Sequence, residues 1–323
     1  MRKDEVIEHL KDDNTELLFR EADHLREKYC GEKVLIRGII EFSNHCVRDC
    51  LYCGLRKSNT RLERYRMSVD EILDIVGKIT GDGVGTVVLQ SGDDPGCAKE
   101  MICGVIREIK KRYPDVAITL SIGERPFEDY RAFREYGADR YLIKHETINP
   151  RLYERLHPGQ TLGKRIEILE SLKKLGYQVG AGNIVGLPGQ TLDDLADDIL
   201  FLEEFQPDMA GIGPFIPQKD TSLKHYLSGD LDLTLKVLAL VRIVTKNAHL
   251  PATTALATVA PKDGQFLGLR SGANVIMPDC TPSVYGDNYN IYDGRARVGM
   301  KKARDVILKA GRTVSTERGD TLK

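Results

Sequence analysis

The chain has 323 residues, enough for one large barrel or for two ordinary domains. Hydrophobic residues make up 41% of it and charged residues 29%, which is typical of a globular protein with a substantial core. The formal net charge is −1, with basic and acidic residues interspersed, so no field of one sign favours nucleic acid or an anionic membrane surface. No apolar run approaches the ~20 residues that cross a bilayer. The composition therefore predicts neither nucleic-acid nor membrane partners.

The first 32 residues show the pattern of one or two amphipathic helices and lack the apolar stretch of a secretory signal. The seven cysteines are odd in number and unevenly spaced, which does not fit a secreted disulfide framework. We therefore predict a reducing, cytoplasmic location. We also predict an N-terminal helical extension over residues 1–32 and a main domain over residues 33–323.

Runs rich in valine and isoleucine alternate with helical patterns along the main domain. The predicted strands are residues 34–42, 86–92, 117–123, 140–146, 178–188, 209–217, 251–259 and 274–279. Between them, apolar residues recur at three- and four-residue spacing in segments such as 68–79, 127–137, 161–176 and 191–205. Ser68 is placed to cap the first of these helices. Alternating strands and helices imply parallel strands joined by right-handed crossovers. Eight such units predict an α/β fold, a complete (β/α)8 TIM-type barrel, with an open doubly wound sheet as the alternative.

Polar and glycine-rich groups follow successive strands at the point where each strand ends. "SNHC" follows the first strand, "QSGDD" the second, "SIGE" the third and "KHE" the fourth, while "VGLPGQ" and "PFIP" come next. In a barrel these ends face one mouth, where barrel enzymes place their chemistry. The sequence therefore predicts an active site at that mouth.

Three of the seven cysteines, Cys46, Cys50 and Cys53, lie within eight residues in the loop after the first strand. Thiolates are soft ligands for zinc or for iron–sulfur clusters. A structural zinc site requires a fourth ligand at short spacing. His45 is poorly placed to be that ligand, because it is adjacent in sequence to Cys46. Three thiolates on a four-iron cluster leave one iron without a protein ligand, and such an open coordination position is a feature of catalytic metal sites. A zinc knuckle and ordinary loop thiols are the alternatives.

The Cys-x3-Cys-x2-Cys spacing, with Tyr52 before the last cysteine, resembles the signature of radical S-adenosylmethionine (SAM) enzymes. The resemblance implies one 4Fe–4S cluster held by Cys46, Cys50 and Cys53. It also implies that SAM chelates the fourth iron and is reductively cleaved to a 5′-deoxyadenosyl radical. "IIEFSNHCVRDCLYCGLRKSN", "VVLQSGDDP", "GADRYLIKHETINP", "GAGNIVGLPGQT" and "PATTALAT" together resemble the HydE family, which helps to build the organometallic subcluster of FeFe-hydrogenase. Biotin synthase and methylornithine synthase are similar relatives.

The family resemblance implies a set of cofactor contacts at the strand ends and in the following helix. These are Tyr52, Gln90, Ser91, Gly92, Ser121, Glu146, Arg165, Gly182 and Gly186. The planar fork of Arg165 suits the methionine carboxylate, and Glu146 suits ribose hydroxyls or an ammonium group. Glycines allow backbone to approach a flat base closely. The acid that often follows the second glycine of this motif is absent, because Gly189 and Gln190 stand there.

A second implied group lies inside the barrel and would bind a small anionic substrate. It consists of Thr119, Lys144, Thr253, Thr254 and Tyr285. Lys144 stands where the family typically has arginine, so a point charge replaces a bidentate fork. Cys280 is the only cysteine after Cys103, so the second cysteine cluster of many HydE proteins is not expected.

The resemblance implies a radical enzyme acting on an iron–cysteinate complex that carries CO and cyanide. Its implied partners are a low-potential electron donor, ferredoxin or flavodoxin, and other hydrogenase maturases. One alternative is a biotin-synthase-like or methylornithine-synthase-like radical enzyme acting on a small sulfur-containing or amino-acid substrate. Another is a cluster-bearing carrier without radical chemistry.

Overall fold

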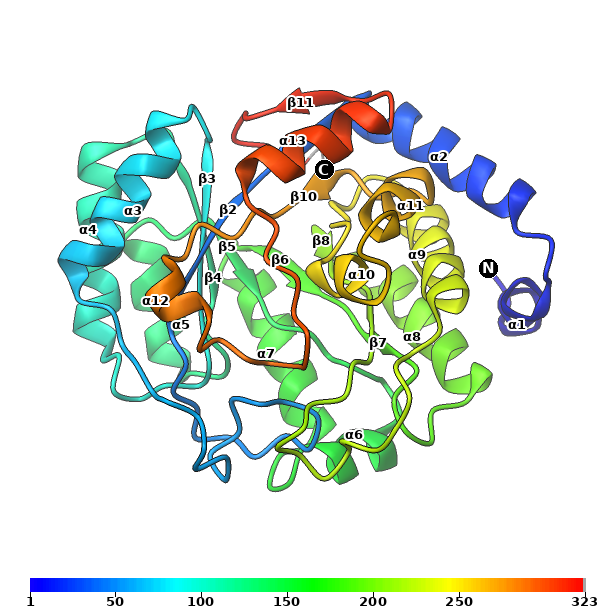
Figure 1. The fold of residues 1–323 in the computed structure, drawn as a ribbon, viewed down its shortest axis with the longest axis horizontal. Coiled ribbons are helices and arrows are strands. Elements are labelled where there is room, and N and C mark those ends of the chain that lie inside the picture. The colour runs from blue at the N-terminus through cyan, green and yellow to red at the C-terminus, as the bar shows by residue number, and fades with distance from the viewer. Residues whose placement is uncertain (322–323) are drawn as a thin grey trace.

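The computed structural model describes residues 1–321, and its centre is a parallel sheet whose strand order follows the chain (Figure 1). The six strands of this sheet are, in order, β2 (Gly38–Ser43), β3 (Thr86–Ser91), β4 (Ala117–Ser121), β5 (Arg140–Leu142), β6 (Gln178–Ala181) and β8 (Met209–Ala210). All neighbouring pairs are parallel. Each crossover therefore returns to an adjacent position, and the predicted α/β fold is confirmed.

Further pairings link the two edges of this sheet. β1 (Lys33–Ile36) runs into β2 through Arg37 and pairs with β10 (Val275–Ile276). Single parallel bridges lie between β8 and β10, joining Met209 to His249 and Pro251 to Val275. The pairing thus continues from β8 towards β1 in the order that a TIM-like arrangement requires.

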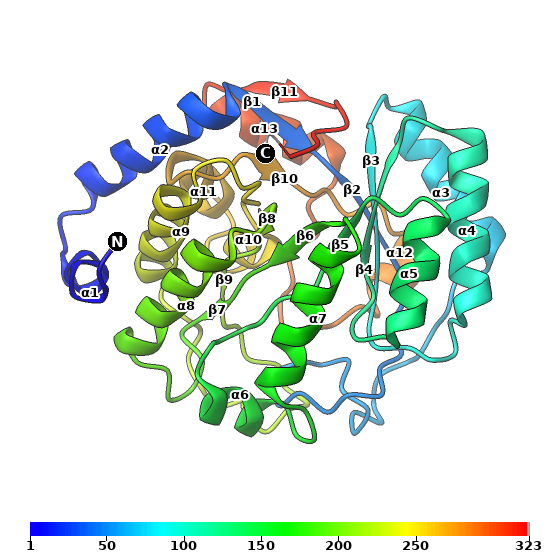
Figure 2. The same ribbon diagram turned by 180° about the vertical axis from the view of Figure 1, so that it is seen from behind.

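Helices cover the outer face of the sheet, as the two opposite views in Figures 1 and 2 show. They are α3 (Val69–Gly81), α4 (Lys99–Arg112), α5 (Phe127–Glu135), α6 (Pro150–Leu156), α7 (Leu162–Lys174), α8 (Leu192–Phe205) and α9 (Leu231–Thr245). The helices predicted over 68–79, 127–137, 161–176 and 191–205 are confirmed. Ser68 caps α3 as predicted, because its hydroxyl accepts from the amide of Glu71, whose carboxylate in turn accepts from the Ser68 amide.

The strand predicted over residues 251–259 is wrong. Only Pro251 forms a bridge there, and the segment continues as helix α10 (Thr254–Val259). The Thr253 hydroxyl accepts from the Leu256 amide and caps this helix. Threonine occurs both in strands and at helix caps. Residue type alone therefore could not decide between a strand and a helix here.

The fifth and sixth predicted strands are shorter than expected. β6 ends at Ala181, and Gly182 has φ 141. The chain then forms β7 (Ile184–Val185), which pairs with β9 (Gly213–Pro214) in a separate two-stranded sheet. The fifth predicted strand is therefore divided at Gly182 into β6 and β7.

The N-terminal helices and the C-terminal part of the chain are neighbours, and Arg312 pairs with Asp23 between them. α1 (Lys3–Lys11) and α2 (Glu16–Cys30) pack against α8 and α9. The C-terminal part contains α11 (Gly264–Arg270), α12 (Ser283–Gly286), α13 (Met300–Lys309) and β11 (Thr313–Ser315), which pairs with β1. A boundary between extension and main domain after residue 32 stays a prediction. No helix within residues 1–321 is long and apolar enough to span a bilayer.

Candidate cluster and cofactor site

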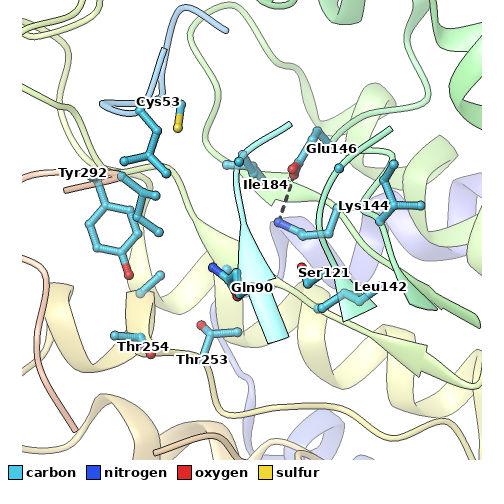
Figure 3. A pocket seen from close by; sticks show the side chains of 18 of the residues that line it. Cys53, Gln90, Ser121, Leu142, Lys144, Glu146, Ile184, Thr253, Thr254 and Tyr292 are labelled. Atoms are coloured by element: carbon cyan, nitrogen blue, oxygen red, sulfur yellow. Dashed lines mark ion pairs between the residues drawn. The ribbon is translucent and has the colours of Figure 1, made fainter. Parts of the chain in front are cut away.

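A cavity of about 420 Å³ lies at the mouth where the strands of the central sheet end (Figure 3). Most of the side chains predicted for the site line it. They are Cys46, Cys50, Tyr52, Cys53, Gln90, Ser91, Gly92, Ser121, Lys144, Glu146, Arg165, Thr253 and Thr254. The fold therefore gathers, around one space, residues that are up to 208 positions apart in the sequence.

The cysteine loop is fixed by backbone contacts to neighbouring elements. The amide of Val47 donates to the carbonyl of Asp93 at 2.9 Å, and that of Leu51 donates to the carbonyl of Leu156 at 2.9 Å. Within residues 1–321, no group of three or more His, Cys, Asp or Glu side chains is arranged to hold a single metal ion. In a 4Fe–4S cluster, each of Cys46, Cys50 and Cys53 would bind a different iron.

The electrostatics of the thiols also fit a cluster. Burial raises the pKa of Cys46, and burial together with the nearby Cys46 raises the pKa of Cys50 to about 12. The pKa of Cys53 is likewise raised by burial and by the neighbouring thiols. Three adjacent thiolates therefore need compensating positive charge, which the irons of a 4Fe–4S cluster supply.

Gly92 lies against the cysteine loop. A Cβ atom added there would stand 2.7 Å from the Cβ of Cys46. Only glycine allows the "QSGDD" loop to pass this close to the thiols. The chain thus brings bare backbone beside the predicted cluster, as a chelating cofactor requires.

A chain of ion pairs joins the cysteine loop to Arg165 on α7. Arg48, which lies inside the cysteine motif, donates from Nε to Asp93 Oδ2 at 2.6 Å and from Nη2 to Glu124 Oε2 at 3.0 Å. Arg165 Nε donates to the other oxygen, Glu124 Oε1, at 3.0 Å, and Arg165 Nη1 donates to the carbonyl of Lys144. These contacts hold the Arg165 guanidinium at the cavity wall.

Asp94 fixes a second loop contact. Its carboxylate accepts from Ser43 Oγ at 2.6 Å and from Arg66 Nε at 2.7 Å. Ser43 ends β2, and the amide of His45 donates to its hydroxyl at 3.2 Å. The buried Asp94 side chain therefore ties the start of the cysteine loop to the loop after β3. Neither this contact nor the Arg48–Glu124 pair was predicted, although the acids of "QSGDD" and "SIGE" were recognised as strand-end groups.

Glu146 reaches the cavity from a left-handed backbone conformation, φ 64. Its backbone is held on both sides, because its amide donates to Gly182 and its carbonyl accepts from Ile184, each at 3.0 Å. Lys144 Nζ lies 2.9 Å from Glu146 Oε2, and both side chains point into the cavity (Figure 3). The cation expected for an anionic substrate is therefore already paired with one of the acids expected for the cofactor.

The ring of Tyr52 is fixed by His157. The Tyr52 hydroxyl lies 2.7 Å from His157 Nε2, and the histidine ring stacks on Tyr153. Burial lowers the pKa of His157 to about 4, so this histidine is neutral at pH 7. The contact orients Tyr52 between Cys50 and Cys53 without adding charge.

The predicted substrate group is only partly assembled around the cavity. Lys144, Thr253 and Thr254 line it, whereas the Tyr285 hydroxyl donates to Glu71 and its ring packs on Tyr65, away from the cavity. Thr119 is buried on the same face of β4 as Ser121 but deeper, and its hydroxyl has no hydrogen-bond partner within the described part of the chain.

Other aromatic and charged groups take the place predicted for Tyr285. Tyr289 and Tyr292 line the cavity, and Gln90 Nε2 donates to the Tyr289 hydroxyl at 3.2 Å. Glu41 lines it too, paired with Arg295, and burial raises the pKa of Glu41 to about 8. The sequence prediction missed the tyrosines and Arg295, since residues 285–297 have no periodic pattern that would fix which side chain faces inward. It missed Glu41 because every residue of β2 is buried, so no alternation marks the inward side. Gly182 and Gly186, which were also predicted for the cofactor site, are not among the lining residues and lie against Gly211 and Gly229.

The family model of the radical SAM superfamily matches residues 40–202 of this chain, a range that includes the cysteine motif. The [FeFe] hydrogenase maturase subunit HydE of Thermotoga maritima is 52% identical over 286 residues, which are 88% of this chain and 81% of that protein. The chain belongs to the HydE family of radical SAM enzymes. The resemblance predicted from the motifs is thereby confirmed.

More distant relatives of this HydE-family enzyme share its fold. The 3-methylornithine synthase of Methanosarcina acetivorans is 27% identical over 267 residues, 82% of this chain and 75% of that protein. The crystal structure of methylornithine synthase superposes with a TM-score of 0.84 at 24% identity, over 97% of this chain and 94% of that one. At this identity the likeness shows the fold alone, and it agrees with the TIM-like arrangement described above.

Proposed function

We propose that this HydE-family enzyme cleaves SAM reductively and acts in the assembly of the FeFe-hydrogenase organometallic cofactor. Its proposed substrate is an iron–cysteinate complex that carries CO and cyanide. The observation that carries the proposal is a single cavity lined by the three half-buried cysteines of the motif and by Lys144, Thr253 and Thr254. Figure 3 shows Cys53, Lys144 and the two threonines around it. The identity to the Thermotoga maritima protein supports the same assignment.

Cys46, Cys50 and Cys53 would hold one 4Fe–4S cluster. When bound, the cluster and SAM supply a one-electron cleavage that yields a 5′-deoxyadenosyl radical. Arg165 would bind the SAM carboxylate, because its planar guanidinium lines the cavity. Glu124 holds it through Nε and Nη2, each at 3.0 Å, and the Lys144 carbonyl holds Nη1. A bound carboxylate would share this guanidinium with Glu124.

The remaining cofactor contacts would come from the strand ends. Glu146 would accept hydrogen bonds from SAM, and Gly92 would let the cofactor approach the loop backbone. Further contacts are assigned to Tyr52, Gln90, Ser91 and Ser121, with Gly182 and Gly186 shaping the adenine side.

The substrate would lie deeper in the cavity. One ammonium and two hydroxyls suit a small anion, which would be the counter-ion of Lys144. Glu146 supplies that counter-ion in the protein alone. We propose that an anionic substrate shares Lys144 with Glu146 while Thr253 and Thr254 donate hydrogen bonds to it. A low-potential ferredoxin or flavodoxin would supply the electron, and other hydrogenase maturases would supply or receive the iron complex.

Two assays test the proposal in sequence. The anaerobically reconstituted protein should convert SAM to methionine and 5′-deoxyadenosine when dithionite is added. It should also restore FeFe-hydrogenase maturation in an extract that lacks its own HydE. Cleavage without maturation would point to the alternative, a radical enzyme for another small substrate. Failure of cleavage with a full iron content would favour the cluster-bearing carrier.

A further inference from the structure

A second hollow, of about 270 Å³, opens on the surface beside the cysteine loop. It is formed by residues 58–61, which follow the last cysteine of the motif, and by residues 219–224, which follow β9. Both segments run at the end of the molecule opposite α13 (Figure 1). We call residues 57–61 and 219–227 the basic face.

Positive charge is concentrated at and beside this face. The whole chain has a net charge of −1, yet residues 54–66 contain five arginines and lysines and a single acid. Arg61 pairs with Asp220 at 3.0 Å. Lys57, Lys219 and Lys224 are exposed, and no ion pair involves them anywhere in residues 1–321. The basic face therefore presents three uncompensated ammonium groups to solvent.

Exposed apolar side chains border these lysines. Tyr226 is 53% exposed and Leu227 is 88% exposed, and both follow Lys224 within three residues. Large apolar groups beside charged ones are typical of protein–protein interfaces, where aromatic anchors supply most of the affinity and charges steer the encounter. The hollow is therefore better suited to a protein partner than to an isolated anion.

The basic face is built directly on the cysteine loop. Gly54 follows Cys53, and a Cβ atom added to Gly54 would lie 3.0 Å from the side chain of Gln218. The Gln218 side-chain oxygen accepts from the amide of Asp220 at 2.7 Å, and its carbonyl accepts from the amide of Thr221 at 3.0 Å. Gly54 and Gln218 therefore connect the hollow to Cys53.

We propose that the basic face is the docking site of an acidic, low-potential electron-transfer protein. This inference rests on the proposed function, which requires a one-electron donor. One electron leaves the reduced carrier and enters the cluster, and no bond to the basic face is made or broken. The lysines orient the carrier, and Tyr226 and Leu227 hold it.

The test uses a flavodoxin as the carrier and the reconstituted enzyme. The variant Lys219→Glu/Lys224→Glu reverses two charges on the basic face. The matched control, Lys301→Glu/Lys302→Glu, reverses two exposed lysines of α13 at the opposite end of the molecule. SAM cleavage is measured with reduced flavodoxin and separately with dithionite, and the ratio of the two rates is compared. Flavodoxin binding is measured by calorimetry at 50 and 500 mM NaCl.

We expect the basic-face variant to lower the flavodoxin-to-dithionite rate ratio at least tenfold at low salt, and to weaken flavodoxin binding at least tenfold. The α13 control should change both by less than twofold, and salt should weaken binding to the unmodified enzyme. An unchanged ratio and affinity in the basic-face variant, or an equal loss in the control, would overturn the proposal. The calorimetric arm needs no SAM cleavage, so failure of the proposed radical chemistry would be recognised separately.

Discussion

Cys50 occupies a position where burial and a neighbouring thiol both disfavour a lone thiolate. Its Sγ atom accepts only a long contact from Gln160, at 3.7 Å. We therefore expect Cys50→Ala to reduce the iron content from about four per chain to less than one after anaerobic reconstitution. Iron and sulfide analysis measures this loss.

The backbone of the cysteine loop keeps its other contacts in that variant, so the far-ultraviolet circular dichroism should be unchanged. Cys103→Ala is the matched control, because Cys103 is buried in α4 away from the cavity. Full iron in Cys50→Ala, or about eight irons in the unmodified protein, would contradict a single three-cysteine site.

Arg165 is the residue that we expect to bind the SAM carboxylate. Its replacement by alanine removes a charge-assisted contact, so SAM affinity should fall by roughly 1.5–3 kcal/mol. Glu124 keeps Arg48 as a partner in this variant, so the loops should stay in place. Calorimetry on the reconstituted protein measures the change. Lys164→Ala is the control, since Lys164 pairs only with Glu167 on the surface. Equal affinities of the two variants would remove Arg165 from the site.

Lys144 separates cofactor chemistry from substrate chemistry. Lys144→Met should retain SAM cleavage by dithionite within a few-fold, because the thiols and Arg165 are untouched. It should lose hydrogenase maturation, because the cation for the anionic substrate is gone. Lys144→Arg keeps the charge and should retain maturation. Maturation by Lys144→Met at the level of Lys144→Arg would show that the substrate does not need this cation.

Single residues at this site were predictable where a motif fixed both type and position. The cysteines, Arg165 and Glu146 all line the cavity as expected. Tyr285 does not, since its position was inferred from a loop without periodicity, and its hydroxyl is used by Glu71. The Arg48–Glu124 pair joins residues 76 positions apart, and nothing in the sequence of either segment identifies its partner.

At the scale of elements, the break between β6 and β7 depends on Gly182. Its φ of 141 is unfavourable for other residues, and an added Cβ would lie 2.7 Å from the Gly211 amide nitrogen. Gly182→Ala should therefore cost roughly 1–3 kcal/mol of unfolding free energy. It should also weaken SAM binding, because Glu146 donates its amide to the Gly182 carbonyl.

Gly163→Ala provides the comparison for Gly182→Ala. Gly163 lies inside α7, and nothing stands within 4 Å of an added Cβ. Alanine there should stabilise the helix by roughly 0.5–1 kcal/mol. Urea denaturation of both variants measures the difference. If Gly182→Ala is as stable as the unmodified protein, the close approach of Gly182 to Gly211 is not needed for the fold.

Helices with start signals were predictable as elements, and short strands were not. The Ser68–Glu71 capping box marks the start of α3 in the sequence as clearly as in the structure. By contrast, residues 251–259 have strand-forming threonines but fold as α10, since the Thr253 hydroxyl satisfies a helix amide and only Pro251 finds a strand partner. Tertiary pairing, which sequence pattern does not report, decides such cases.

At the scale of the whole molecule, the parallel α/β order was predictable because strand and helix periods alternate throughout the main domain. The sequence did not predict which residues cover the end of the sheet where its strands begin. Residues 316–321 lie across that end, and Arg140, which is fully buried, donates to the carbonyls of Arg318 and Gly319 and to the carboxylate of Asp320. These partners are about 180 residues from Arg140 in the sequence, so only the fold brings them together.

The last prediction follows from that buried arginine. Deleting residues 316–323 removes three acceptors from Arg140 and leaves Gln178 and the Thr86 hydroxyl. Breaking a buried ion pair on one side costs roughly 3–5 kcal/mol, so the truncated protein should lose at least about 3 kcal/mol of unfolding free energy. Glu317→Ala, which breaks the exposed pair with Lys33, should leave the unfolding free energy almost unchanged, because exposed ion pairs contribute little to stability. Adding Arg140→Met to the truncated chain removes the uncompensated charge and should recover part of the loss, whereas Arg140→Met in the full chain should destabilise. Equal effects of Arg140→Met in the two backgrounds, measured by urea denaturation, would show that the tail does not stabilise the fold through Arg140.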